Sequence, residues 1–216
     1  MIKVIPAILA TTEEEYYNKI SEINNSGLFD WIQIDLMDNK FVQNQSIEPD
    51  VIAKYKTNLN LEAHLMVEYP ENWIDELVKI PQLNRIIFPV EDREGITERI
   101  THIKNHGKQV GLAINPETDI SILEPFLNKI DLVLIMSVHP GFQGQKFIPE
   151  TVNKINEVLR LRSGFDFKIE IDGGISEENI KQVADAGADI AIIGSGLFKY
   201  DNLKVGLEKI QATRLR

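Results

Sequence analysis

Short apolar runs rich in β-branched residues alternate with amphipathic segments eight times along the chain. Each run is bounded by polar residues or by Gly and Pro, which predicts strands at Lys3–Leu9, Trp31–Leu36, Leu59–Leu65, Arg85–Val90, Gln109–Ile114, Leu132–Ser137, Phe167–Ile171 and Ile190–Gly194. Helical patterns lie between and after them at Thr12–Asn25, Pro49–Lys56, Pro70–Val78, Ile96–Asn105, Ile120–Leu127, Pro149–Leu161, Glu177–Ala186 and Asn202–Ile210. Thr12 and Glu15 have the spacing of a capping box, and Ser176 stands where an N-cap belongs before Glu177.

Strict alternation of this kind predicts an α/β fold, a closed parallel (β/α)8 TIM barrel. A chain of 216 residues is a normal size for one such domain, so residues 1–216 are expected to form a single barrel. A doubly wound open sheet is the alternative. No Gly-x-Gly-x-x-Gly follows the first strand, where Pro6-Ala7-Ile8-Leu9-Ala10 stands instead, and the barrel is therefore favoured.

The charge and the composition exclude several classes of partner. A net charge of −10 and a pI near 4.9 argue against nucleic acid and against an anionic membrane surface. The chain has no cysteine, so a bound metal would take nitrogen or oxygen ligands. No run approaches the ~18 apolar residues of a membrane span, and no long apolar segment precedes Pro6. A cytoplasmic protein is expected.

A glycine-bearing loop follows the sixth predicted strand. Met136 closes the strand, Pro140 interrupts the chain, and Gly141-Phe142-Gln143-Gly144 leads toward the helix predicted from Pro149. Glycine allows a ligand to approach the backbone, and bare N–H groups before a helix attract anions. The loop therefore predicts a phosphate site, although an ordinary strand-to-helix turn would have the same composition.

Two further glycine loops follow the seventh and eighth strands, where TIM barrels often bind phosphate. They are Asp172-Gly173-Gly174 and Gly194-Ser195-Gly196, the second of which could begin a short helix at Ser195–Phe198. Carboxyl ends of parallel barrel strands meet at one mouth. The three loops together predict a small phosphorylated substrate lying across that mouth.

Ionisable residues end three of the predicted strands. Gln33 and Asp35 share one side of the second strand, His64 ends the third, and Asp172 ends the seventh. Two carboxylates and an imidazole in a partly apolar cup favour a divalent cation that compensates their charge. Taken singly, the aspartates could instead be strand-end caps, and His64 could be a core histidine. His102, His106 and His139 are interpreted as helix-end and loop residues.

These motifs resemble, in order and spacing, those of the ribulose-phosphate 3-epimerase family and the related allulose-6-phosphate 3-epimerases. The likeness runs from Pro6 to about Phe198 and rests on segments 35–41, 63–66, 136–147, 172–175 and 194–195. It implies a phosphate-binding barrel in which Asp35 and Asp172 form the acid/base pair and also hold one divalent metal ion (Zn, Mn, Fe or Mg) together with His64. It implies no organic cofactor, and it suggests a homo-oligomer. Substrate contacts are expected from His64, Met136, Gly141, Phe142, Gln143, Gly144, Gly173, Gly174, Gly194 and Ser195.

The chain departs from the family pattern near the expected metal. Gln33 replaces a histidine, Ala7 and Ala10 replace serines, Pro89 replaces another histidine, and Gln143 replaces a small residue. An amide oxygen is a harder ligand than an imidazole nitrogen, so Gln33 is expected to be a weak ligand for zinc. Epimerisation of ribulose 5-phosphate to xylulose 5-phosphate is the leading hypothesis. A six-carbon ketose phosphate as substrate, an inactive sugar-phosphate-binding relative, and aldol or decarboxylation chemistry are the alternatives.

Overall fold

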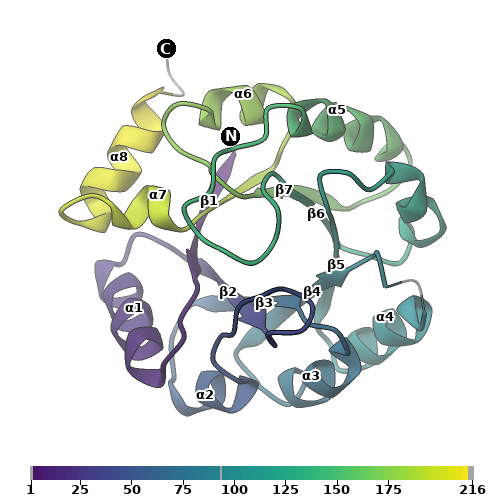
Figure 1. The fold of residues 1–216 in the computed structure, drawn as a ribbon, viewed down its shortest axis with the longest axis horizontal. Coiled ribbons are helices and arrows are strands. Elements are labelled where there is room, and N and C mark those ends of the chain that lie inside the picture. The colour runs from purple at the N-terminus through teal and green to yellow at the C-terminus, as the bar shows by residue number, and fades with distance from the viewer. Residues whose placement is uncertain (1, 93, 214–216) are drawn as a thin grey trace.

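A computed structural model describes residues 2–92 and 94–213, so Met1, Arg93 and residues 214–216 of the predicted domain lie outside it. Eight parallel strands close into one barrel in sequence order, with helices around the outside (Figure 1). The strands are β1 (Lys3–Ile8), β2 (Trp31–Met37), β3 (Asn60–Met66), β4 (Leu83–Pro89), β5 (Gln109–Ile114), β6 (Leu132–Met136), β7 (Lys168–Asp172) and β8 (Ile190–Ile193). The predicted TIM barrel is confirmed.

The helices of the outer ring are α1 (Glu13–Ser26), α2 (Pro49–Lys54), α3 (Pro70–Leu77), α4 (Ile96–Asn105), α5 (Thr151–Leu161), α6 (Ile180–Asp185), α7 (Ser195–Phe198) and α8 (Leu203–Thr213). The predicted N-cap of α1 is confirmed, because the Glu15 N–H donates to Thr12 Oγ1 at 3.2 Å. The Glu15 carboxylate accepts from the N–H and the hydroxyl of Thr11.

Two predicted helices differ from the structure. The segment Ile120–Phe126 is a 3₁₀ helix, η1, because Pro125 lacks the N–H that an α-helix needs. The helix predicted from Glu177 begins at Ile180, and Ser176 is not its N-cap. Ser176 Oγ accepts the Glu178 N–H within a preceding turn, and the Ser176 N–H donates to the side chain of Asn179.

Two apolar layers hold the barrel together. The larger lies between the strands and the helices and contains side chains such as Ile34, Leu65 and Ile171. The smaller fills the barrel interior and includes Ile5, Ile87 and Leu134. Because side chains alternate along each strand, the interior also receives every second residue of β2, β3 and β7, and these are largely polar.

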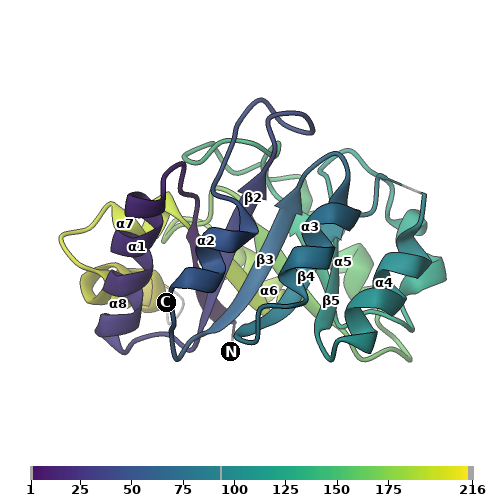
Figure 2. The same ribbon diagram turned by 90° about the horizontal axis from the view of Figure 1, so that it is seen from below.

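The carboxyl ends of all eight strands open at one end of the barrel, where the connecting loops rise highest (Figure 2). The loops after β2 and β6 meet there, because Asn44 Nδ2 donates to the Gly141 carbonyl at 2.7 Å. No helix among residues 2–92 and 94–213 is long and apolar enough to cross a bilayer.

Candidate active site

Strand register brings the predicted ionisable residues together at the mouth. Asp35 and His64 are register partners on β2 and β3, and Asp172 ends β7 on the other side of the barrel. His64 Nδ1 lies 3.5 Å from Asp35 Oδ1 and 3.6 Å from Asp172 Oδ2. These distances correspond to charge contacts rather than hydrogen bonds. The Gln33 amide completes this group, and we call Gln33, Asp35, His64 and Asp172 the mouth cluster.

Gln33 bridges the two aspartates. Its Nε2 donates to Asp35 Oδ1 at 2.8 Å and to Asp172 Oδ2 at 2.7 Å. The side chain is completely buried, and its Oε1 has no hydrogen-bond partner among the described residues. The Gln33 amide nitrogen therefore lies between the two carboxylates and reduces the repulsion between them. Gln33 Oε1, the atom expected to bind a metal, makes no hydrogen bond to a described residue.

Electrostatics in the mouth cluster are dominated by burial and by the proximity of the charges. Burial raises the pKa of Asp35, and the Asp172 charge adds to this rise while His64 opposes it. Burial alone would lower the pKa of His64, but Asp172 and Asp35 outweigh it and raise that pKa to about 9. A raised carboxyl pKa beside a second carboxylate is suited to proton transfer, because one group can hold a proton while the other is ionised.

The mouth cluster fits a divalent cation. One ligand atom each from Asp35, His64 and Asp172 lie within 4.8 Å of one another. His64 Nδ1 is buried and makes no hydrogen bond to a described residue, so it is available as a ligand. Two carboxylate oxygens and one imidazole nitrogen are ligands for zinc and for harder ions such as manganese.

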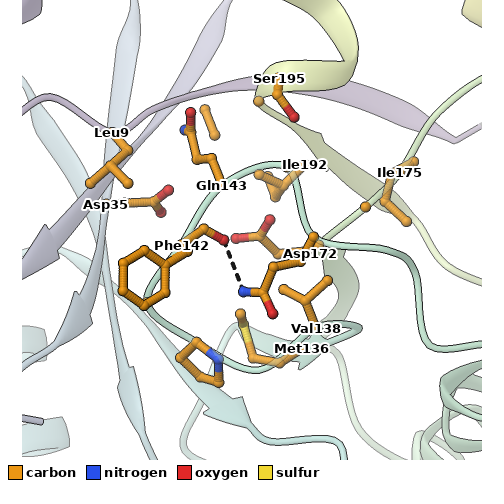
Figure 3. Close-up of a pocket in the computed structure, with 18 of the residues that line it drawn as sticks. Leu9, Asp35, Met136, Val138, Phe142, Gln143, Asp172, Ile175, Ile192 and Ser195 are labelled. Carbon is orange, nitrogen blue, oxygen red and sulfur yellow. Dashed lines mark hydrogen bonds between the residues drawn. The ribbon is translucent and has the colours of Figure 1, made fainter. Parts of the chain in front are cut away.

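A pocket opens directly above these carboxylates (Figure 3). Its empty space is about 570 Å³, counting the part open to solvent. All three glycine loops line it, together with Asp35, Asp172 and Met136. Gly141, Phe142, Gln143, Gly144, Gly173, Gly174, Gly194 and Ser195 are all among its lining residues, whereas His64 lies below the floor. His64 is therefore the one residue predicted to contact the substrate that does not line this pocket.

Glycine is required at the seventh-strand loop. Gly173 and Gly174 have φ of +121° and +63°, a region that other residues rarely adopt. A Cβ on Gly174 would meet the Phe147 backbone nitrogen at 2.5 Å, so the loops after β6 and β7 pack backbone to backbone. Ser137 reinforces this contact, because its Oγ donates within 2.9 Å of the Asp172 carbonyl and 2.7 Å of the Gly173 carbonyl.

Of the departures from the family pattern, only Ala7 and Gln143 line the pocket. Ala7 lines the pocket wall, and the Gln143 side chain reaches over Gly194, where its Nε2 lies 3.1 Å from the position of a Cβ. Ala10 is buried in the layer between strands and helices, and Pro89 ends β4. His139 is exposed beside Glu117, and His102 pairs with Asp75 on the outer surface, so neither belongs to the mouth cluster.

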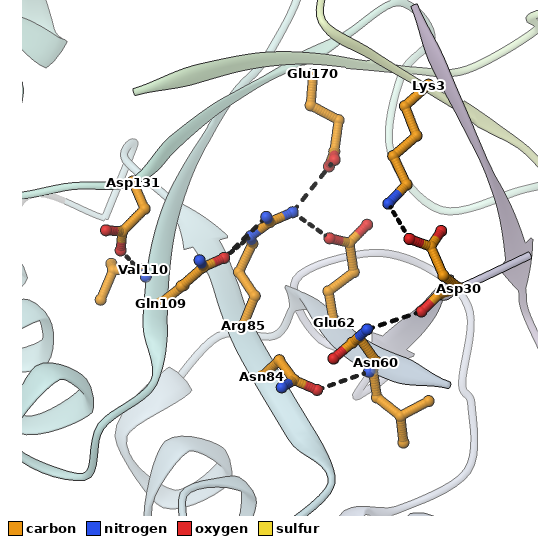
Figure 4. Close-up of polar contacts among 11 residues, drawn as sticks. Lys3, Asp30, Asn60, Glu62, Asn84, Arg85, Gln109, Val110, Asp131 and Glu170 are labelled. Atoms are coloured by element: carbon orange, nitrogen blue, oxygen red, sulfur yellow. Dashed lines mark hydrogen bonds and ion pairs between the residues drawn. The ribbon is translucent and has the colours of Figure 1, made fainter. Parts of the chain in front are cut away.

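Glu62, Arg85 and Glu170 form a second group of buried charges (Figure 4). Glu62 and Glu170 stand two residues before His64 and Asp172, so this group lies nearer the amino ends of the strands. Arg85 Nη1 lies 2.5 Å from Glu62 Oε2 and 3.7 Å from Glu170 Oε2, and Gln109 Oε1 accepts from Arg85 at 2.9 and 3.1 Å. We call the buried residues Glu62, Arg85 and Glu170, together with the exposed Gln109, the Arg85 layer. Burial raises the pKa of Glu62 to about 7 despite Arg85, and burial together with the Glu62 charge raises that of Glu170.

Sequence reasoning missed the Arg85 layer, although the signal was present. Glu62 and Glu170 stand two residues before His64 and Asp172, so strand alternation points all four side chains to the interior. Applied to β4, the same alternation of side chains places Arg85 in the barrel interior as well.

Comparison with known proteins gives a consistent result. Residues 3–198 match the model of the "Ribulose-phosphate 3 epimerase family". The chain is 37% identical over 211 residues to a ribulose-phosphate 3-epimerase of Buchnera aphidicola, covering 95% of this chain and 92% of the relative. It is 34% identical over 219 residues to the Bacillus subtilis enzyme of that name, covering 99% of this chain and 100% of the relative.

Solved structures support the fold. A 3-hexulose-6-phosphate synthase from Salmonella typhimurium superposes with a TM-score of 0.72 at 19% identity, covering 99% of both chains. Identity at this level is evidence for a shared barrel and not for a shared reaction.

Proposed function

The chain belongs to the ribulose-phosphate 3-epimerase family and is a ketose-phosphate epimerase, and we propose that its reaction is the inversion of C3 of D-ribulose 5-phosphate to give D-xylulose 5-phosphate. The observation that carries this proposal is the convergence of Asp35 and Asp172 beneath one pocket lined by three glycine loops. A protein that only binds sugar phosphate would have little reason to bury two like charges at this point, so the inactive-relative hypothesis is not favoured.

The substrate is oriented by its two ends. Backbone N–H groups of the loops at Gly141–Gly144, Gly173–Gly174 and Gly194–Ser195 bind the phosphate, as glycine-rich backbone does in many barrels. The sugar then extends over the floor of the pocket, with Met136 and Phe142 excluding water from its apolar edge. C3 comes to lie between the two carboxylates.

Two proton transfers invert the centre. The C3 proton is acidified by the neighbouring C2 carbonyl, so one aspartate takes it and the C–H electron pair becomes part of an enediolate. The other aspartate, which enters the reaction protonated, returns a proton to the opposite face of C3. The two carboxyl groups exchange protonation states, and the reverse reaction or exchange with solvent restores them. Either aspartate could be the base in this direction.

A divalent cation held by Asp35, His64 and Asp172 would stabilise the negative charge that develops on the substrate oxygens. In the orientation that the structure shows, Gln33 Nε2 donates to both carboxylates.

Epimerisation in deuterated water tests the proposal. Ribulose 5-phosphate is incubated with the purified protein and followed by proton NMR, with allulose 6-phosphate as the six-carbon comparison. We expect deuterium at C3 of both five-carbon epimers, and slower exchange on the longer sugar. Faster exchange on allulose 6-phosphate would reassign the substrate, and no exchange on either sugar with added Zn²⁺ or Mn²⁺ would contradict the proposed reaction.

A further inference from the structure

Gln33 and the Arg85 layer form one continuous row across the barrel wall. Gln33 is the register partner of Glu62, Glu62 of Arg85, and Arg85 of Gln109, on the consecutive strands β2 to β5. Adjacent strands are about 4.8 Å apart, so neighbouring side chains on the same face are within contact range. Gln33 therefore lies between two groups of charges, with the aspartates on one side and Glu62 on the other.

Five buried polar atoms of the mouth cluster and the Arg85 layer lack a hydrogen-bond partner among the residues that the structure describes. They are Gln33 Oε1, Glu62 Oε1, His64 Nδ1 and both carboxylate oxygens of Glu170. Gln33 and Glu62 are both completely buried, and when Glu62 is ionised their unpaired atoms are both acceptors. Leaving buried polar atoms unpaired is unfavourable, so this arrangement is expected to have a second state that pairs them.

Glu62 cannot turn its free oxygen elsewhere without losing an ion pair. Its Oε2 is held by Arg85 Nη1, and the guanidinium is fixed in turn by Gln109. The oxygen left over is Oε1. Arg85 thus determines which Glu62 atom is free to accept a further hydrogen bond.

The geometry points to Glu62 as a positioning residue that accepts the Gln33 amide in a second, rotated orientation. In the orientation seen here, Nε2 donates to both aspartates. A half-turn of the amide plane exchanges its oxygen and nitrogen, so that Oε1 faces the aspartates and Nε2 faces Glu62. This inference rests on the cation site of the proposed function, because a cation attracts the oxygen and repels the N–H groups.

The rotated state would pair Gln33 Oε1, Glu62 Oε1 and His64 Nδ1 at once. A cation in the mouth cluster would take His64 Nδ1 and Gln33 Oε1 as ligands, and Glu62 Oε1 would accept from the Gln33 nitrogen. Without the cation, the amide returns to screen Asp35 from Asp172. Gln33 is thereby a ligand whose availability depends on Glu62.

The substitution Glu62→Gln tests this dependence. Its amide can still accept from Arg85, while its new N–H group can donate to Gln33 Oε1 and hold Gln33 in the unrotated orientation. Affinity for Zn²⁺ and Mn²⁺ is measured by calorimetry for Glu62→Gln in the wild-type chain and in a Gln33→Met background, where no amide can rotate. The loss of one negative charge is common to both backgrounds.

We expect Glu62→Gln to weaken cation binding at least about tenfold more in the wild-type background than beside Met at position 33, the size of one hydrogen bond to a charged group. An equal loss in both backgrounds would show that Glu62 acts only through its charge and would overturn the inference. Melting temperatures measured without metal identify any variant that has not folded.

If a variant does not fold, a measurement on the wild-type chain still tests the inference. The side-chain amide signal of Gln33 is followed by ¹⁵N NMR while Zn²⁺ is added. A new signal position on Zn²⁺ binding supports rotation, and an unchanged amide, or no binding of Zn²⁺, overturns it. C3 exchange without an amide response contradicts only this inference, whereas an amide response without C3 exchange contradicts only the proposed reaction.

Discussion

The barrel interior contains two buried groups of acidic side chains, and they are neutralised in different ways. In the Arg85 layer, a guanidinium of the chain itself sits between Glu62 and Glu170. In the mouth cluster, none of the ion pairs among the described residues brings a lysine or arginine to Asp35 or Asp172, and His64 is the only basic group in contact. The Arg85 layer therefore has its positive charge within the chain, whereas the mouth cluster can take a positive charge from a bound cation.

This difference separates a structural role from a chemical one. The carboxylates of the Arg85 layer are buried with their guanidinium and do not line the pocket, so they cannot reach a bound substrate. In the mouth cluster, burial and the Asp172 charge raise the pKa of Asp35, and both aspartates line the pocket. The contrast therefore predicts that substitutions of the mouth aspartates change turnover, and that removal of Arg85 changes stability, whereas Glu62 also acts on the mouth cluster through Gln33.

Substitution of either mouth aspartate is expected to have the largest effect. Asp35→Asn or Asp172→Asn removes a proton-transfer group with little change of shape, so turnover of ribulose 5-phosphate should fall by roughly 10²–10⁴-fold. The melting temperature should be unchanged or higher, because repulsion between the two carboxylates is relieved. A coupled assay of xylulose 5-phosphate and a thermal melt check both parts, and a fully active variant would remove that aspartate from the reaction.

Removal of Arg85 should instead reduce stability. Arg85→Met leaves Glu62 and Glu170 without their counter-charge, and breaking a buried ion pair costs about 3–5 kcal/mol of unfolding free energy. Urea denaturation measures the loss. The matched control replaces Glu62 and Glu170 by leucine as well, and most of the stability should return. If the single Arg85→Met variant were as stable as the wild type, Arg85 would not stabilise the buried glutamates, and the structural role given to the Arg85 layer would be wrong.

A histidine at position 33 should strengthen metal binding by the mouth cluster. Gln33→His supplies an imidazole nitrogen in place of an amide, which completes a four-ligand set with Asp35, His64 and Asp172. Zinc affinity should rise by roughly tenfold or more, with a smaller gain for manganese. Competition with a chromophoric chelator gives both constants, using Gln33→Met as the variant that lacks a ligand. Equal, tight zinc binding by wild type and Gln33→His would show that the glutamine does not weaken the site.

The smallest effect is expected at the phosphate end of the pocket, away from both acidic groups. Ser195→Ala removes one exposed hydroxyl but keeps the backbone N–H groups, so KM should rise by only a few fold, equivalent to about 0.5–1.5 kcal/mol. The value of kcat should be unchanged, because the contact is the same in the ground state and the transition state. A large fall in kcat would place this serine closer to the reacting carbon than proposed.

The fold and the convergence of the site were predictable because both follow from local pattern. Alternating elements predict the barrel, and strand-end position with side-chain parity places Asp35, His64 and Asp172 at one mouth. Helix ends were less predictable. Pro125 changes the hydrogen-bonding class of η1, and the turn at Ser176 depends on a competing contact with Asn179.

The orientation of Gln33 could not be predicted from the sequence. Whether its nitrogen or its oxygen faces the aspartates depends on Asp172, which is 139 residues away and reaches it only when the barrel closes. The Arg85 layer likewise depends on the register between β3 and β4, which shifts between Leu61 and Glu62. Both features depend on contacts between distant parts of the chain, which the hydrophobic periodicity of the sequence does not predict.

Anomalous diffraction from crystals soaked in Mn²⁺ or Zn²⁺ tests the contrast between the two acidic groups most directly. An open mouth cluster predicts one anomalous peak bounded by Asp35, His64 and Asp172, and none between Glu62 and Glu170, where Arg85 already supplies the positive charge. A peak in the Arg85 layer, or a mouth cluster that remains without one at millimolar metal, would contradict the division of roles between them.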